Sequence, residues 1–200
     1  MRRRILHRAL LAASVLAMPT AVHAHLVTTG LGPLYDGISH FALTLEDLLP
    51  ALALAFLAGL RGAAVGRLVL FLLPGAWLAG GIAGLVWPTV STATVPTTVS
   101  FIAIGGLVAL DARIRPPWVA ALALVLGLLH GYLNGSAMSE ARLGALGLAG
   151  IVASLFVVVA QAAALVVALR APWARIAVRV AGSWIAAVGL LVLGWSLRPA

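Results

Sequence analysis

Apolar residues fill most of this chain in long runs, and short breaks containing arginine, proline, glycine or small polar residues separate them. The runs do not alternate between polar and apolar positions every second residue, which argues against the strands of a membrane barrel. They predict six transmembrane helices, over residues 45–60, 64–87, 95–110, 117–135, 144–169 and 175–197. The first and third runs are close to the lower limit of about 17 residues for a helix that crosses a bilayer.

The composition supports an all-α integral membrane protein. Hydrophobic residues make up 63% of the chain and charged residues 9%, whereas soluble domains carry about 25% charged residues. We expect one six-helix domain over residues 25–200. The net charge of +8 comes entirely from arginines scattered between the apolar runs, so it does not indicate a nucleic-acid-binding surface. The absence of cysteine excludes disulfides and thiolate metal sites.

Residues 1–24 have the pattern of a secretory signal peptide. Four arginines lie in the first eight residues, a short apolar core follows, and Val22-His23-Ala24 resembles a cleavage site. The apolar core is too short to cross a bilayer about 30 Å thick. We expect cleavage after Ala24, which makes His25 the first residue of the mature chain; a retained anchor is the alternative.

The arginines predict how the helices are oriented in a bacterial inner membrane. Seven of them flank the first, third and fifth connections between the six runs, and two lie at the other connections or the C-terminus. Cytoplasmic loops are enriched in arginine, so both ends of the mature chain are predicted to be periplasmic. A cleaved signal peptide requires the same topology.

Small residues recur every four positions in two of the runs. They are Ala76, Gly80 and Gly84 in the second, and Gly127, Gly131 and Gly135 in the fourth. Such stripes allow helices to approach closely. Six helices also divide into two inverted halves of three, an arrangement found in transporters, in which the first and fourth helices would be equivalent. The six tryptophans lie mostly near the ends of runs, as in an interfacial belt.

Polar residues inside the apolar part of the chain are the candidate functional residues, because they are costly in a membrane and usually face a partner or a cavity. They form two groups, which are Asp36, His40, Glu46 and Asp47 before and at the start of the first helix, and His130 and Asn134 in the fourth. Asp36 and His40 share a face if their segment is helical. His130 and Asn134 are likewise four residues apart, beside the glycine stripe.

Structural alternatives exist for both groups. Thr44 and Asp47 fit a capping box, in which the carboxylates only cap the first helix. Asp36-Gly37 could be only a turn, and a single buried histidine such as His130 is often a hydrogen-bonded core residue.

Imidazole and carboxylate groups together suit Ni²⁺, Co²⁺, Zn²⁺ or Cu²⁺, among which affinity alone does not choose. His25 adds a further ligand if its free amine and ring chelate an ion together. We expect no tightly bound cofactor, and a divalent metal ion as the substrate.

Two segments resemble the HupE/UreJ family of membrane proteins. HFALTLEDLLPAL, residues 40–52, is similar to the family's H-P-x-x-G-x-D-H-x-x-A-M signature, and LHGYLNG, residues 129–135, is similar to its F-H-G-x-A-H-G-x-E motif. The resemblance implies a six-helix secondary nickel or cobalt permease linked to hydrogenase or urease maturation. His40 and His130 match histidines of these motifs, and Glu46 stands where the family has aspartate.

This chain also departs from the two motifs. Asp47 and Asn134 replace their second histidines, and Ala137 stands where the second motif ends in glutamate. The candidate ligand set is therefore richer in oxygen, which weakens the specific case for nickel.

The sequence thus predicts a transporter rather than an enzyme. In this hypothesis Asp36, His40, Glu46 and Asp47 gather the ion at the outer mouth, and His130 and Asn134 line a deeper site. No nucleotide-binding loop is present in the sequence, so a gradient or a partner protein would drive transport. The alternative is a non-transporting accessory protein that supports the assembly of a metalloenzyme in the membrane.

Overall fold

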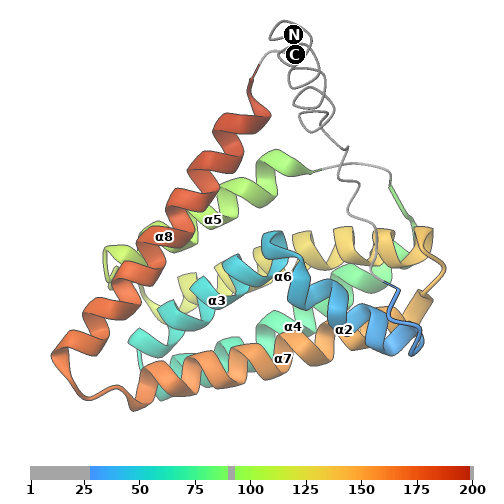
Figure 1. Cartoon of the computed structure of the whole chain (residues 1–200). Helices are drawn as coiled ribbons and strands as arrows, with labels where there is room; N and C mark the ends of the chain where they lie inside the picture. Colours follow the sequence, from blue (N-terminus) through green and yellow to red (C-terminus); the bar gives the residue numbers. More distant parts are fainter. Residues whose placement is uncertain (1–27, 90–92, 199–200) are drawn as a thin grey trace, which may run out of the picture.

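The computed structural model describes residues 28–89 and 93–198, and every regular element within them is a helix (Figure 1). The helices are α2 (Pro33–Leu43), α3 (Leu45–Leu60), α4 (Ala63–Val86), α5 (Thr94–Ala109), α6 (Pro116–Glu140), α7 (Gly144–Ala168) and α8 (Pro172–Ser196). The predicted signal peptide and His25 lie outside the described residues.

The six predicted runs coincide with α3 to α8, mostly within one residue at each end. Larger differences are the start of α8 and the end of α6, which continues from the predicted residue 135 to Glu140. This extension is stabilised by packing, since Met138 is fully buried in the core. The helix stops near Arg142, which has a positive φ of 60°.

All six predicted runs form helices, but six membrane-spanning helices are not confirmed. Among the described residues, α4, α6, α7 and α8 are long and apolar enough to cross a bilayer, and α2 with α3 could form a fifth, broken span. α3 and α5 have 16 residues each, and a helix of that length rises only about 24 Å. The inverted repeat stays a prediction.

The segment before α3 is itself a helix, α2, which meets α3 at an angle of 70°. Thr44 separates the two helices with extended backbone angles, φ −87° and ψ 94°. α2 packs along α7 (Figure 1), and glycines at the crossing allow this contact. A Cβ atom at Gly37 would collide with the backbone of Gly147.

α3 is the central helix of the described bundle. It packs against α4, α5 and α7, and ten of its 16 residues are buried. α8 has only five buried residues among 25, so most of its surface is available to lipid. In Figure 1, α5 and α8 form a pair that diverges from α4 and α7, and α3 lies between the two pairs.

The two small-residue stripes pack against each other, as predicted for close helix packing. α4 and α6 make the most extensive helix contact of the bundle. A Cβ atom at Gly131 would collide with the carbonyl oxygen of Trp77, and one at Gly84 with that of Tyr132. The backbones of α4 and α6 therefore touch directly, which only glycine allows.

Three connections meet at one end of the bundle through Asp111. Arg61, at the end of α3, and Arg175, in the first turn of α8, both pair with this carboxylate, the latter at 3.3 Å. Arg179 donates from Nε to the carbonyl of Ala109 at 2.9 Å. The first, third and fifth connections thus lie on the same side, as the arginine distribution predicts.

We expect Gly131→Ala to destabilise the protein by about 1–3 kcal/mol, because the added methyl group must separate α4 from α6. Gly75→Ala is the matched control, since a Cβ atom there meets nothing within 4 Å. Thermal unfolding in detergent, followed by circular dichroism, measures both variants. Equal unfolding temperatures for the two would contradict direct backbone contact.

Asp111→Asn should lower stability by about 1–3 kcal/mol, between the values typical of exposed and buried ion pairs. The change retains a residue that tolerates the positive φ of 48° at this position but leaves Arg61 without its counterion. The same unfolding assay applies, with Glu140→Gln, an exposed acid on α6, as the control. A shift no larger than that of the control would show that the ion pair does not hold these connections together.

Candidate metal site

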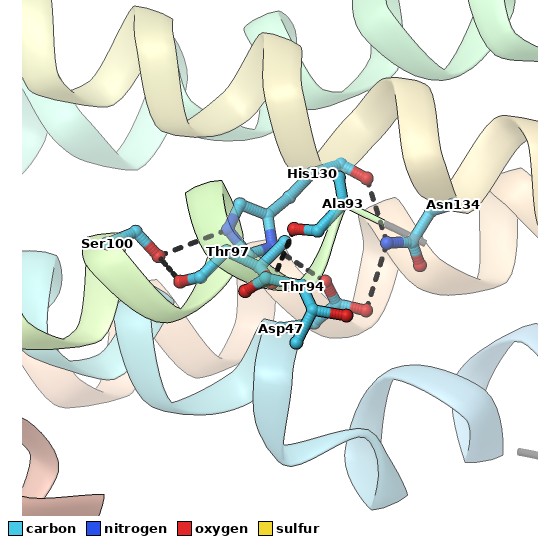
Figure 2. A network of polar contacts seen from close by, with 7 residues as sticks. All are labelled: Asp47, Ala93, Thr94, Thr97, Ser100, His130 and Asn134. Atoms are coloured by element: carbon cyan, nitrogen blue, oxygen red, sulfur yellow. Dashed lines mark hydrogen bonds and ion pairs between the residues drawn. The ribbon is translucent and has the colours of Figure 1, made fainter. Parts of the chain in front are cut away.

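Asp47 joins α3 to α6 through both of its carboxylate oxygens (Figure 2). Oδ1 lies 2.8 Å from Nδ1 of His130. Oδ2 accepts a hydrogen bond of 2.9 Å from Nδ2 of Asn134. All three residues were predicted from the sequence as ligands, and the structure brings them together although Asp47 is 83 positions from His130 and 87 from Asn134 along the chain.

All three residues are buried inside the bundle. His130 is fully buried, Asn134 is 3% exposed and Asp47 is 5% exposed. A carboxylate in such surroundings requires partners, because its desolvation in an apolar medium costs several kcal/mol. The two N–H donors provide them, so Asp47 is stable there only while α6 is in place.

Local helix geometry explains why these side chains converge. His130 and Asn134 are four residues apart on α6 and therefore share a face, and Nδ2 of Asn134 also donates to the carbonyl oxygen of His130 at 2.8 Å. Asp47 occupies the first turn of α3, where the helix dipole favours a negative charge.

The capping interpretation of Asp47 is wrong in its main point. Thr44 is the N-cap residue of α3, but its side chain makes no cap hydrogen bond. The Asp47 side chain is directed to α6 and not back to the cap. The carboxylate therefore serves a contact between helices.

Ser100 on α5 extends the network, and the sequence analysis did not identify it. Its Oγ lies 3.3 Å from Nε2 of His130 and donates at 2.5 Å to the carbonyl oxygen of Thr97. A serine in an apolar run gives little signal, because its hydroxyl can satisfy itself on the preceding helical turn.

Trp77 was expected in an interfacial belt, and this prediction is wrong. Trp77 is fully buried, and its ring centroid lies 5.4 Å from that of His130. Phe41 meets Trp77 edge-on at 6.0 Å. The Trp77 ring of α4 therefore lies beside His130, and Phe41 of α2 packs against Trp77.

Two atoms of the network have either no hydrogen-bond partner or only a distant one, so they could bind a ligand. Oδ1 of Asn134 is buried and has no hydrogen-bond partner within the described residues. Nε2 of His130 makes the long 3.3 Å contact to Ser100. Histidines that bind metals usually donate their other ring N–H to a carboxylate, and Asp47 stands in this relation to His130.

The remaining predicted site residues lie around this centre. His40, on α2, is half-buried and lies next to the side chains of Asp47 and Asn134. Glu46 is exposed. Asp36 is buried, and its Oδ1 accepts bonds of 2.6 Å from both the amide and the hydroxyl of Thr29, so this carboxylate stabilises the start of α2.

Across the parts of the chain that the structure describes, no three side chains of His, Cys, Asp or Glu are gathered closely enough to form a metal cage. The centre is therefore one carboxylate, one imidazole and one amide, with His40 adjacent. Such a sparse set does not hold an ion as firmly as a structural site with four ligands.

Ser100, His130 and Asp47 follow one another in the order of a hydrolase triad. A serine hydrolase also needs free N–H groups to stabilise an oxyanion. Ser100 lies within α5, where backbone N–H groups are bonded along the helix. The arrangement therefore does not support acyl-transfer chemistry.

Comparison with known proteins gives one match. A family model described as HupE / UreJ protein matches residues 12–192, which is most of the chain. No curated protein and no solved structure matches the chain significantly.

A double-mutant cycle between Asp47→Ala and Asn134→Ala should give a coupling energy of about 1–2 kcal/mol, because either change alone leaves a buried polar group unpaired. Reversible unfolding in mixed micelles measures it. The neighbouring acid Glu46 provides the control, and its cycle with Asn134 should be additive within about 0.5 kcal/mol. Similar coupling for both acids would contradict the specific role of Asp47.

Proposed function

The chain belongs to the HupE/UreJ family, and we propose that it is a secondary transporter for a divalent transition-metal ion of the nickel–cobalt class. The family is associated with nickel or cobalt transport or with metalloenzyme maturation, and the structure has the apolar helices of a multi-pass membrane protein. In our proposal the transporter lies in a bacterial inner membrane, both mature termini are periplasmic, and its metal supplies the maturation of a hydrogenase or urease.

The observation that carries this proposal is the contact of Asp47 with His130 and Asn134 inside the bundle. Ionisable residues within a membrane domain mark ion pathways more often than structural contacts. Here an imidazole is oriented by a carboxylate, as in metal sites, and an adjacent amide oxygen has no partner within the described residues. Together these groups offer nitrogen and oxygen donors to a small divalent cation.

An entry route follows from the positions of the surrounding residues. Glu46 is exposed at the start of α3, and the half-buried His40 lies next to the side chains of Asp47 and Asn134. We propose that Glu46 attracts the cation, that His40 passes it inward, and that His130, Asn134 and Asp47 form the inner site. We include Asp36 in the proposed outer mouth although its carboxylate also holds Thr29, and His25 would offer a further imidazole ligand if it is the mature N-terminus.

The sparse ligand set favours transport over storage. A transported ion must bind strongly enough to lose its water and weakly enough to leave. A site with few protein ligands, one of them a neutral amide, meets the second requirement. It also leaves room for the ion to retain water, which replaces ligands that a structural site would supply.

Metal uptake into proteoliposomes containing the full chain tests the proposal. His130→Ala and Asp47→Asn should lower the initial rate of Ni²⁺ or Co²⁺ uptake about 10–100-fold, as loss of a ligand or of its orienting partner does in metal sites. His40→Ala should raise the metal concentration needed for half-maximal uptake. Glu140→Gln, an exposed acid on the same helix as His130, should leave uptake unchanged.

Tryptophan fluorescence separates binding from transport in the same samples. Paramagnetic Ni²⁺ or Co²⁺ at His130 should quench the emission of Trp77, whose ring lies 5.4 Å away. Trp77→Phe should lose this part of the signal. Equal uptake in all variants would overturn the proposal, and quenching without uptake in the native protein would favour the accessory function.

A further inference from the structure

A second feature lies between α4 and α7, away from the site around His130. A groove of about 270 Å³ runs between the first two turns of α4 and the second half of α7, and its lining residues include Ala63, Gly66, Arg67, Ala160, Ala164 and Ala168. Most of the lining is alanine or glycine. In Figure 1, α4 and α7 lie side by side along this length.

The side chains of α4 and α7 are not tightly packed against each other at this groove. A Cβ atom at Gly66 would meet Ala163 Cβ at 3.7 Å and Val167 Cγ2 at 4.0 Å, which are ordinary van der Waals separations. The glycines in the contact between α4 and α6 are in a different situation, because a Cβ atom at any of them would collide with the facing helix. Gly66 is therefore not needed for α4 and α7 to approach each other, and the small residues leave the apolar groove open at the surface of the bundle.

Arg67 lines this groove, and its side chain is exposed. It makes no ion pair within the described residues, whereas Arg61 and Arg175, at the same end of the bundle, share Asp111. A guanidinium without a counterion, next to an apolar groove, is complementary to a molecule with a negatively charged headgroup and an apolar tail. Its position at the arginine-rich end of the bundle corresponds to the level of lipid headgroups.

We propose that this groove binds one anionic phospholipid, with an acyl chain lying between α4 and α7 and the phosphate paired with Arg67. Basic pockets between membrane helices on the cytoplasmic side are suited to anionic headgroups. The charge distinguishes this groove from a larger one of about 440 Å³ beside Phe41, which is lined by apolar residues and Ser154 alone. That second groove gives no sign of a particular occupant.

Native mass spectrometry of the full chain, titrated with phosphatidylglycerol or with phosphatidylcholine of the same acyl length, tests the proposal. Arg67→Gln should weaken the first phosphatidylglycerol adduct about fivefold, the effect of one basic residue at an anionic membrane surface. Gly66→Leu should abolish the phosphatidylglycerol adduct, because the leucine side chain fills the groove. Binding of phosphatidylcholine should be weaker in the native protein and little changed by Arg67→Gln.

Two variants are matched controls. Arg113→Gln removes another exposed arginine predicted to be cytoplasmic, and Gly75→Leu adds the same side chain to α4 at a place where a Cβ meets nothing within 4 Å. Both should retain the native affinity for phosphatidylglycerol. Circular dichroism of each variant verifies that it is folded.

Three results would overturn the proposal. Arg67→Gln and Arg113→Gln could weaken the lipid equally, which would indicate only a general charge effect. The native protein could bind both lipids equally. A protein dimer that Gly66→Leu dissociates would show that a second copy of the chain occupies the groove.

Discussion

The buried carboxylate of Asp47 is the constraint on which the rest of the arrangement depends. A charged group inside an apolar bundle is stable only when specific donors face it. The donors come from α6, so α6 must lie close enough to α3 to supply two N–H groups at 2.8 and 2.9 Å. The glycine stripe of α6, which packs directly on α4, sets the rotation of α6 that turns His130 and Asn134 inward.

α3 is held by charge at both of its ends. Asp47, in its first turn, contacts α6, and Arg61, just after its last residue, pairs with Asp111 between α5 and α6. Between these ends the helix is held by buried apolar side chains. The polar contacts are exchangeable, because water or a cation can replace a hydrogen-bond partner, whereas apolar packing cannot be opened without creating a cavity. If the protein transports an ion as we propose, α3 would therefore move most easily through changes in the contacts at its two ends.

Much of the fold could be predicted from the sequence, because the arginine, glycine and proline residues that interrupt the apolar runs lie close to the helix ends. The sequence left open whether the segment before α3 is helical, because that helix is defined by contact and not by composition. α2 contains a glycine and several polar residues, and it is stabilised by packing on α7. Six spans are not confirmed because α3 and α5, with 16 residues each, are too short to count as spans by themselves.

The site was predictable in the residues that are costly to place in an apolar run and not in the residues that carry no such cost. Asp47, His130 and Asn134 stand out because each is costly in an apolar run. Ser100 and Trp77 carry no such cost, since serine can bond to its own helix and tryptophan is frequent at membrane interfaces. Only the three-dimensional packing of α4, α5 and α6 shows that both lie against His130.

The two positions at which this chain replaces a histidine of the family motifs, Asp47 and Asn134, contact each other directly at 2.9 Å. Nδ2 of Asn134 donates both to Oδ2 of Asp47 and to the carbonyl oxygen of His130 one helical turn earlier. Both carboxylate oxygens of Asp47 are thereby paired, and Asp47 lies in position to orient His130, whereas Oδ1 of Asn134 has no partner among the described residues. The two departures from the motifs therefore meet in one hydrogen-bonded pair beside His130. If the centre binds a metal ion as we propose, its donor set is richer in oxygen than that of the motifs, which bears on selectivity rather than on the presence of ligands.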